Sequence, residues 1–354
     1  MFSCFGSILR KLAPAFAAAL LLASCGMMDD VGDDCSTDKR IYFRYDYNML
    51  FADAFPHEVK TLTLYAFNDS GRVVYTRRAS TDSIIAKGYM DVSDLPSGKY
   101  NFQVWAEGEQ RQADTYLYGA DQAAAAGNTA LQQPQLTASI NRNGTEINHD
   151  LTPLYYGRLN NADFTDFRTR GRREATIYLR KDTELFRIVL QNLSGDSLKA
   201  DDFSFYITDN NGSLDADNNI ITPADTLTYR AWAQYSGSAG ISSGDNPETI
   251  TGINTVVAEI TTNRLVRELN SRKHNMLLHV VRRSDAKEIV RINLTDACLL
   301  VKGNYNRSMS DQEYLDRQDT WDFVFFLDAN RNWLAARIYV QQWMVVLQSS
   351  DLGA

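Results

Sequence analysis

Apolar and polar residues alternate with a period of two along most of this 354-residue chain. In the segment 40–47, Ile41, Phe43, Tyr45 and Tyr47 fall on one face of an extended backbone. This period is typical of a β-strand that buries one face, whereas an amphipathic helix repeats every ~3.6 residues. Because the alternation recurs in segment after segment, we expect the chain to be all-β.

Turn residues separate the alternating segments and set the number of strands. After 40–47, the sequence predicts strands at 59–67, 72–77, 100–106, 151–159, 175–180, 185–193, 203–209, 255–260, 276–281, 289–294, 321–327, 335–340 and 344–347. The stretch 108–150 has few β-branched residues and is expected to form loops, with one short helix near 120–126. Ser310 and Glu313 have the spacing of a capping box, which predicts a short helix at 311–316.

Two series of strands flank an arginine-rich stretch, TRGRRE, at 169–174. A basic, exposed connector of this kind is the expected domain boundary. Strands at short spacing with few helices then predict two tandem β-sandwiches, residues 39–172 and 173–354. The turn and strand of DLPSGKYNFQVWAEG, 94–108, resemble those of transthyretin-like sandwiches.

The N-terminal segment has the layout of a secretory signal peptide. Two basic residues, Arg10 and Lys11, precede an apolar run at 12–22, and this run is too short to span a bilayer. Leu22, Ala23 and Ser24 precede Cys25, and this tetrapeptide resembles the bacterial lipobox. The resemblance implies that residues 1–24 are removed and that Cys25 carries lipid on its sulfur and amino group. The alternatives are an ordinary signal peptide or a buried apolar helix.

Residues 25–38 are rich in Asp and show no secondary-structure period, so they are expected to form an acidic tether. Acidic residues shortly after a lipidated cysteine resemble the surface-export signal of lipoproteins in Bacteroides-like bacteria. That resemblance implies a lipid-anchored protein exposed on the outer membrane. The alternative is a plain solvated linker.

The net charge of the chain limits the classes of molecule that it can bind. The chain carries 36 basic and 44 acidic residues, a net charge of −8, and loss of residues 1–24 removes two basic residues and no acidic ones. An acidic chain of this kind is unsuited to nucleic acid or to an anionic bilayer surface. No second apolar stretch approaches 18 residues, so lipid is the expected membrane attachment.

The four cysteines leave one possible disulfide in the mature chain. Cys4 departs with the signal peptide and Cys25 is lipidated, so Cys35 and Cys298 remain. Two cysteines in an exported protein can pair, and closing so long a loop would stabilise the fold by several kcal/mol. The alternative is two unrelated buried thiols.

No motif for catalysis, metal or cofactor binding stands out. GISSG at 240–244 matches the nucleophile-elbow pattern, but loop residues surround Ser242 where a strand and a helix are required. The four histidines have no metal-ligand spacing, and no CxxC pair occurs. The glycine of DNNGSLDADNN, 209–219, is out of register for an EF-hand. Spacing singles out no carboxylate pair of the glycosidase type, and we expect no enzyme.

Two long stretches resemble a known family. They are YDYNMLFADAFPHEVKTLTLYAFNDSGRVV at 45–74 and MSDQEYLDRQDTWDFVFFLDANRNW at 309–333. Both resemble the fimbrillin-associated anchor lipoproteins of Bacteroidales, and LPSGKY, LTPLYYG and VQQWMVVLQSSDL extend the likeness over most of 36–352. The resemblance implies two transthyretin-like domains, fimbrillin subunits as partners and a role in fimbrial assembly without catalysis.

The resemblance also implies a mechanism, in which a strand of one subunit completes the sheet of the next. An anchor is expected to keep its first strand, here Arg40–Tyr47, because the lipid hangs from it. The C-terminal segment 338–347 would enter the groove of the lowest fimbrillin. Its candidate donor residues share one parity, and they are Ile338, Val340, Met344 and Val346. The alternative is an ordinary internal strand.

A surface lipoprotein that binds glycans beside an outer-membrane sugar importer would share the lipobox, the tether and the tandem sandwiches. Such a protein usually presents tryptophan and tyrosine side chains on one exposed face. Of the five tryptophans, four lie in or beside segments expected to be strands, where core packing is the commoner role; the five are Trp105, Trp232, Trp321, Trp333 and Trp343.

Overall fold

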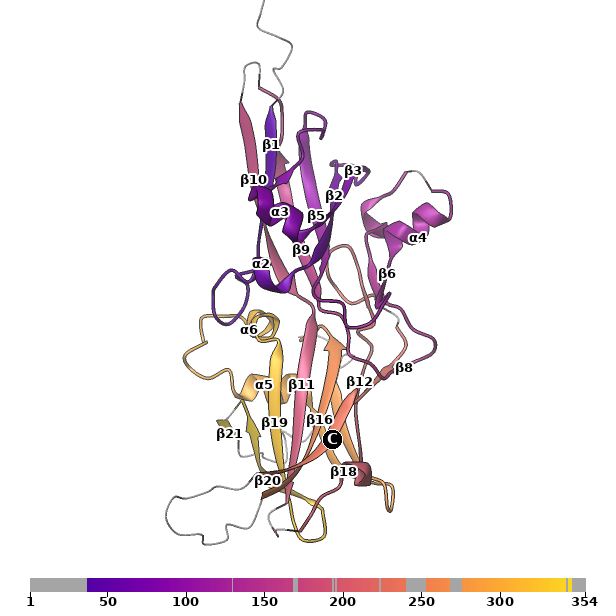
Figure 1. Ribbon diagram of the computed structural model, residues 1–354, viewed down its shortest axis with the longest axis vertical. Coiled ribbons are helices and arrows are strands. Elements are labelled where there is room, and N and C mark those ends of the chain that lie inside the picture. The colour runs from indigo at the N-terminus through magenta and orange to yellow at the C-terminus, as the bar shows by residue number, and fades with distance from the viewer. Residues whose placement is uncertain are drawn as a thin grey trace, which may run out of the picture.

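The computed structural model describes residues 37–128, 130–167, 171–192, 194, 196–222, 224–239, 253–267, 276–341 and 343–345. The described strands form two bodies stacked along the long axis of the molecule (Figure 1). The described helices are short, none longer than 7 residues. The expected all-β class is therefore confirmed.

The upper body is built on a seven-stranded sheet with the order β3-β2-β5-β9-β10-β1-β4. Its elements are β1 (Asp38–Arg44), β2 (Thr61–Phe67), β3 (Val73–Ser80), β4 (Met90–Asp91), β5 (Lys99–Glu107), β9 (Leu154–Asp163) and β10 (Arg172–Lys181), with helices α2 (Phe55–Glu58) and α3 (Thr81–Lys87). Side chains from β1 and β10 meet those from β2, β5 and β9 in one apolar core. The sheet therefore folds over itself into a sandwich-like body.

Strand β10 connects the two parts of this sheet. Its residues 172–178 pair in parallel with β1, and its last residues, 179–181, pair antiparallel with β9. A Cβ atom at Gly157 of β9 would lie 2.6 Å from Leu179 Cδ2 and 2.8 Å from Ile177 Cγ2. The glycine thus permits the close approach of the two strands.

The lower body is a sandwich of two sheets. The six-stranded sheet has the order β15-β16-β11-β19-β20-β21, and the five-stranded sheet has the order β18-β17-β12-β14-β8. The elements are β8 (Glu146–Ile147), β11 (Thr183–Asn192), β12 (Phe203–Asp209), β14 (Leu227–Arg230), β15 (Ala233–Ala239), β16 (Ile253–Asn263), β17 (Leu277–Arg282), β18 (Lys287–Asn293), β19 (Thr320–Leu327), β20 (Trp333–Val340) and β21 (Trp343–Val345), with η2 (Ala200–Asp202), α5 (Leu294–Leu300) and α6 (Asp311–Arg317). Every second residue of β12 and β19 is buried, as the alternation predicts. Ser310 Oγ accepts from Glu313 N at 3.0 Å, which confirms the helix expected at 311–316.

The stretch 108–150 is more ordered than the sequence suggests. The expected helix is present as α4 (Gly119–Ala125), but the stretch also forms β6 (Tyr116–Tyr118), η1 (Gln133–Gln135) and β7 (Ala138–Ile140). Strand β7 pairs with β6 and with β13 (Ser213–Leu214), and β8 pairs in parallel with β14 of the lower sandwich. Strands of two or three residues are too short to show a period, so the pattern could not reveal them.

The change from one body to the other occurs at Asp182 and not within the arginine-rich stretch. The sequence predicts the boundary between residues 172 and 173, but β10 begins at Arg172 and lies between β9 and β1 in the upper sheet. Arg172 lies on the strand and forms an ion pair with Asp38 at 3.0 Å. Arginines on the exposed side of a strand resemble a solvated connector when only the sequence is seen.

Candidate functional site

Most of the residues singled out from the sequence lie outside the described ranges, namely Leu22, Ala23, Ser24, Cys25, Cys35, Ser242 and Val346. Cys298 is described: it lies in α5 with its side chain fully buried, and burial raises the pKa of its thiol. Lipid attachment at Cys25 and the Cys35–Cys298 disulfide therefore stay predictions.

Strand β1, the first described element, is held in the core of the upper body. Ile41 and Phe43 of the strand are 0% and 6% exposed and Tyr45, directly after it, is 1% exposed, so the face that carries these residues is the buried one. The ring of Phe43 stacks on Phe55 at 5.7 Å, and the ring of Tyr45 meets Tyr155 edge-on at 5.2 Å. Full burial of each such side chain contributes about 1.5–3 kcal/mol to stability, so this strand is an integral part of the fold.

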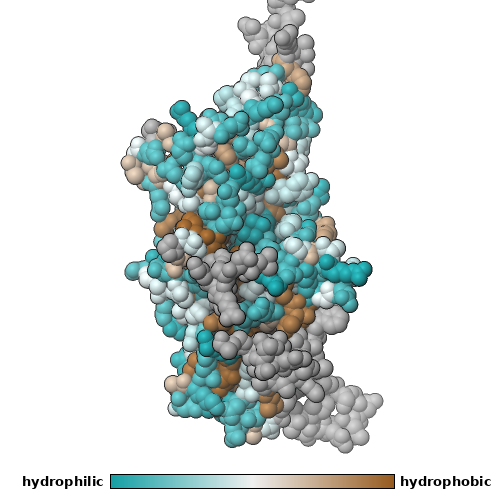
Figure 2. Space-filling view, turned by 180° about the vertical axis from the view of Figure 1, so that it is seen from behind, coloured by the Kyte–Doolittle hydropathy of each residue, from teal (hydrophilic) through white to brown (hydrophobic). Residues whose placement is uncertain are grey.

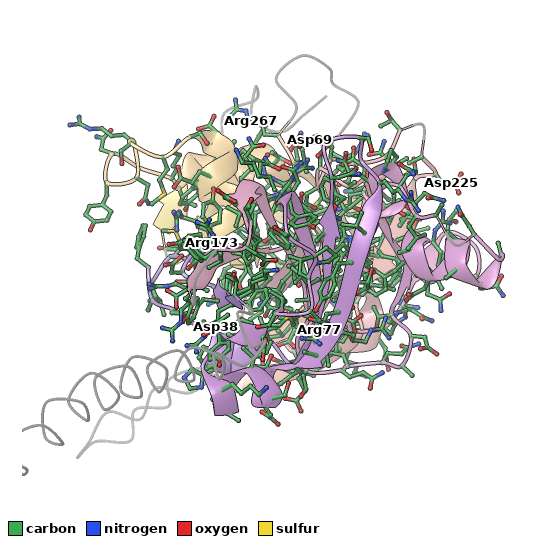
Figure 3. The ribbon with its side chains drawn as sticks, turned by 90° about the horizontal axis from the view of Figure 1, so that it is seen from above. Asp38, Asp69, Arg77, Arg173, Asp225 and Arg267 are labelled. Carbon is green, nitrogen blue, oxygen red and sulfur yellow. The ribbon has the colours of Figure 1, made fainter. Side chains whose placement is uncertain are left out.

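Polar contacts fix the beginning of β1. Lys39 is 2% exposed, and its Nζ donates to the carbonyl oxygen of Leu95 at 2.5 Å and pairs with Asp166 at 2.8 Å. A hydrogen bond from Arg40 lowers the pKa of Asp38, the first residue of the strand. Figure 3 shows Asp38 and Arg173 on the same side of the molecule, as the parallel pairing of β1 with β10 requires.

The segment that follows β1 reaches the lower body. Arg317 of α6 donates from Nη1 to the carbonyl oxygens of Asp46 and Asn48 at 3.2 and 3.4 Å. Its guanidinium lies 4.0 Å from the ring centroid of Tyr47 and 4.7 Å from that of Phe51. Hydrogen bonds and cation–π contacts from one side chain thus join the loop after β1 to α6, which lies directly below it (Figure 1).

A buried network of charges joins the two bodies behind this contact. Arg264, which follows β16, donates from Nε and Nη2 to the two oxygens of Asp316 in α6, each at 2.8 Å. Arg180 at the end of β10 donates to the same carboxylate at 3.0 Å. Arg264 Nη1 also donates to the carbonyl oxygen of Asn218 at 2.6 Å. Arg264 and Asp316 are 6% and 3% exposed, so this pair is shielded from water.

Two further carboxylates lie beside this network at the start of β11. Burial raises the pKa of Asp182 to about 6, although Arg180 and Arg264 favour its charged form. Asn218 Nδ2 donates to Asp182 Oδ1 at 2.9 Å. Burial also raises the pKa of Glu184, which accepts a hydrogen bond from Trp321 Nε1 at 3.0 Å. This network could not be predicted from the sequence, because its hydrogen-bonded partners lie up to 137 positions apart.

The C-terminal strands form a hairpin at one edge of the six-stranded sheet. Strand β20 pairs with β19 on one side and with β21 on the other, so Ile338 and Val340 lie in an internal strand. Val340 is 0% exposed. Met344 lies in β21, which pairs with β20 through three positions, 343–345, and ends the sheet. Of the predicted donor residues, Met344 is the one that the structure describes on an edge strand.

Two properties of the described residues bear on function. They contain no group of three or more His, Cys, Asp or Glu placed to hold a metal ion. None of the described helices is both long and apolar enough to cross a membrane. Figure 2 shows a largely hydrophilic rear surface, on which apolar residues gather in small separate patches.

The family described as fimbrillin-A associated anchor proteins Mfa1 and Mfa2 matches residues 32–349 of the chain. This range includes both bodies, the β1 strand and the C-terminal hairpin. The family is of a fimbrial anchor type and not an enzyme family. No curated protein matches the chain.

Solved structures of similar proteins share the fold of this chain. A candidate adhesin from Bacteroides thetaiotaomicron is 29% identical, covers 87% of this chain and 97% of its own, and has a TM-score of 0.71. A candidate polysaccharide-binding protein from the same species is 27% identical, with 89% and 99% covered and a TM-score of 0.69. The fimbrial anchor protein Mfa2 from Porphyromonas gingivalis is 17% identical, with 88% and 99% covered and a TM-score of 0.59, which shows a shared fold.

Replacing Arg264 tests the network between the bodies. Arg264→Met removes both bonds to Asp316 and leaves a buried carboxylate with fewer partners, so the free energy of unfolding should fall by about 3–5 kcal/mol. The control is Arg267→Met, which breaks a more exposed pair with Asp311 and should cost at most about 1 kcal/mol. Urea denaturation of the three proteins measures both values; equal losses would contradict a structural role for the buried pair.

Asp182 predicts a pH dependence of stability. Its pKa is about 6 in the folded protein and about 3.9 in an unfolded chain. Between these values the folded protein holds a proton that the unfolded chain has released, so wild-type stability falls as pH rises from about 4 to 6. Relative to Asp182→Asn, the loss should be about 2–3 kcal/mol. Urea denaturation at several pH values checks this, and parallel curves for the two proteins would refute it.

Proposed function

Because the chain belongs to the family of fimbrillin-A associated anchor proteins Mfa1 and Mfa2, we propose that it is an outer-membrane lipoprotein that holds fimbriae at the cell surface and takes part in their assembly. In this proposal Cys25 carries the lipid, residues 25–38 form the tether, and the two bodies stand outside the membrane. A fimbrillin-type subunit is the partner. Nucleic acid is not a partner.

The observation that carries this proposal is the position of β1. The strand begins at the end of the tether and contributes Ile41 and Phe43 to the upper core, and Tyr45 directly after it lies in the same core. Its main chain is paired with β10 along its whole length and with β4 at Arg40 and Ile41. A strand held in this way keeps the lipid covalently attached to a folded domain, as an anchor must do.

The C-terminal hairpin is the proposed contact with the basal fimbrillin. Among the described strands β21 pairs with β20 alone, so in this proposal its outer edge receives a strand from another subunit. Donation of β21 itself would break only its three register pairs with β20. Donation of Val340 would also remove a fully buried side chain from the lower core, which costs more. We therefore assign strand complementation to β21 and not to the whole segment 338–347.

Glycan binding alone is the second candidate function, and the 27%-identical relative described as polysaccharide-binding favours it. The tryptophans give it limited support, because Trp105 and Trp321 are buried while Trp232 is 36% exposed. The two functions differ in a direct test. A glycan-binding lipoprotein would bind on a glycan array and would carry no fimbrial subunit through purification.

Loss of the lipid site should separate fimbriae from cells. In Cys25→Ala the protein should leave the membrane fraction, and fimbriae should appear in the medium. Pull-down of the wild type from membranes, followed by mass spectrometry, should recover a fimbrillin-like protein. If the wild type brings down no such protein, the anchoring function is wrong.

Proline in β21 tests the site of strand complementation. Met344→Pro removes a backbone donor from the edge of the six-stranded sheet, so co-purification of the fimbrillin-like protein should fall at least tenfold. The matched control is Thr76→Pro in β3, the edge strand of the upper sheet, which should leave co-purification unchanged. Equal recovery with both variants would place the contact elsewhere.

A further inference from the structure

A cavity of about 410 Å³ lies on the upper body, away from β1 and from the C-terminal hairpin. Its walls come from β2, β3 and β5 on one side and from β6 and α4 on the other. In Figure 1 the part of the chain that carries β6 and α4 stands to the right of the seven-stranded sheet. The volume falls within the range of small-molecule sites, about 300–1,000 Å³.

Three aromatic side chains line the cavity, and the polar atom of each is already engaged. Trp105 Nε1 donates to the carbonyl oxygen of Leu136 at 2.9 Å, and the Tyr116 hydroxyl donates to that of Thr152 at 2.9 Å. The Tyr118 hydroxyl donates to Glu107 Oε1 at 2.6 Å. The rings are therefore fixed, and what they offer a ligand is their carbon surface. Trp105 and Tyr116 are almost fully buried, so Tyr118 presents the most accessible ring.

Polar groups around the rings have spare hydrogen-bonding capacity. Within the described part of the chain, the Lys60 amine, the Gln110 amide and the Asp114 carboxylate have no side-chain partner. Arg78 and Asp121 pair across the rim at 3.2 Å, and both are exposed. Donors and acceptors are thus both present around an aromatic wall.

This combination favours a neutral ligand with many hydroxyl groups. A hydroxyl both donates and accepts, so it can satisfy ammonium, amide and carboxylate groups in turn, whereas a carboxylate ligand can only accept. Two cations and three carboxylates line the cavity, so neither an anion nor a cation gains a large Coulomb advantage. The carbon-bound hydrogens on one face of a sugar ring pack against an aromatic ring.

Strands β2 and β5, on the sheet side of the cavity, offer no edge to an extended peptide, and of the strands that line it only β3 and β6 lie at the end of a described sheet. Strand β2 is paired with β3 and β5, and β5 is paired with β2 and β9. Neither of these strands has a free edge at which a peptide could add its backbone.

We propose that this cavity binds a short neutral saccharide, with Tyr118 as the stacking residue and Lys60, Gln110 and Asp114 as hydrogen-bonding residues. The site is additional to the anchoring function and does not depend on it. A protein at the base of a surface fibre could thereby contact a glycan through a face that neither the lipid nor the fimbrial partner uses.

Calorimetric titration of the full-length protein tests the proposal. The detergent must contain no sugar, and the probes are maltose, cellobiose, lactose and sucrose. At least one should bind saturably. Tyr118→Ala should weaken that binding at least tenfold, whereas Tyr118→Phe keeps the ring and should change it by less than threefold. Gln110→Ala alters an exposed side chain that the fold does not need and should weaken binding at least threefold.

The matched control is Tyr178→Ala, which removes a 56% exposed tyrosine from β10 of the same sheet and should leave binding unchanged. Far-UV circular dichroism confirms that each variant is folded. Saturable binding by none of the four sugars would overturn the proposal, as would unchanged binding in both Tyr118→Ala and Gln110→Ala. Stronger binding of digalacturonate than of every neutral sugar would overturn the choice of a neutral ligand. None of these results bears on the co-purification that tests anchoring.

Discussion

The buried pair of Arg264 and Asp316 is the constraint around which the two bodies are arranged. A charge removed from water is tolerated only when its partner and further hydrogen bonds are in place. Here the partners come from the end of β16, from α6 and from the end of β10, so all three elements must be correctly placed together. Arg180 and Asp182 lie where the chain passes from the upper sheet to the lower one. Their ion pairs therefore hold this connection between the bodies in the same network.

Apolar packing reinforces the same arrangement. Side chains of the upper body, among them Trp105 and Tyr156, belong to the apolar cluster that fills the lower sandwich. Strand β8 precedes β9 and β10 of the upper sheet in the sequence, yet it pairs with β14 in the lower five-stranded sheet. Strand β13 follows β12 of the lower body in the sequence and pairs with β7. The two bodies therefore share an apolar core and strand pairing, and they form one folded unit and not two independent domains joined by a linker.

Local patterns in the sequence predicted the local elements well. The alternation in 40–47 predicted a strand there, although Tyr42 on the other face left open which face is buried. The spacing of Ser310 and Glu313 located α6. The relation between the bodies could not be predicted, since it depends on pairs distant in sequence and on strands of two or three residues. Arg172 illustrates the limit, because an arginine in a strand and an arginine in a linker look alike until the partner strand is known.

The parallel pairing of β1 with β10 has a mechanical consequence. Both strands start at the same end of the upper body, and β10 continues through Asp182 into β11 of the lower body. A force that draws the N-terminus one way and the lower body the other slides β1 along β10 in shear. All seven register pairs then resist together, whereas a peeling force would break them one after another. The direction in which the first strand enters its sheet thus suits the chain to carry tension.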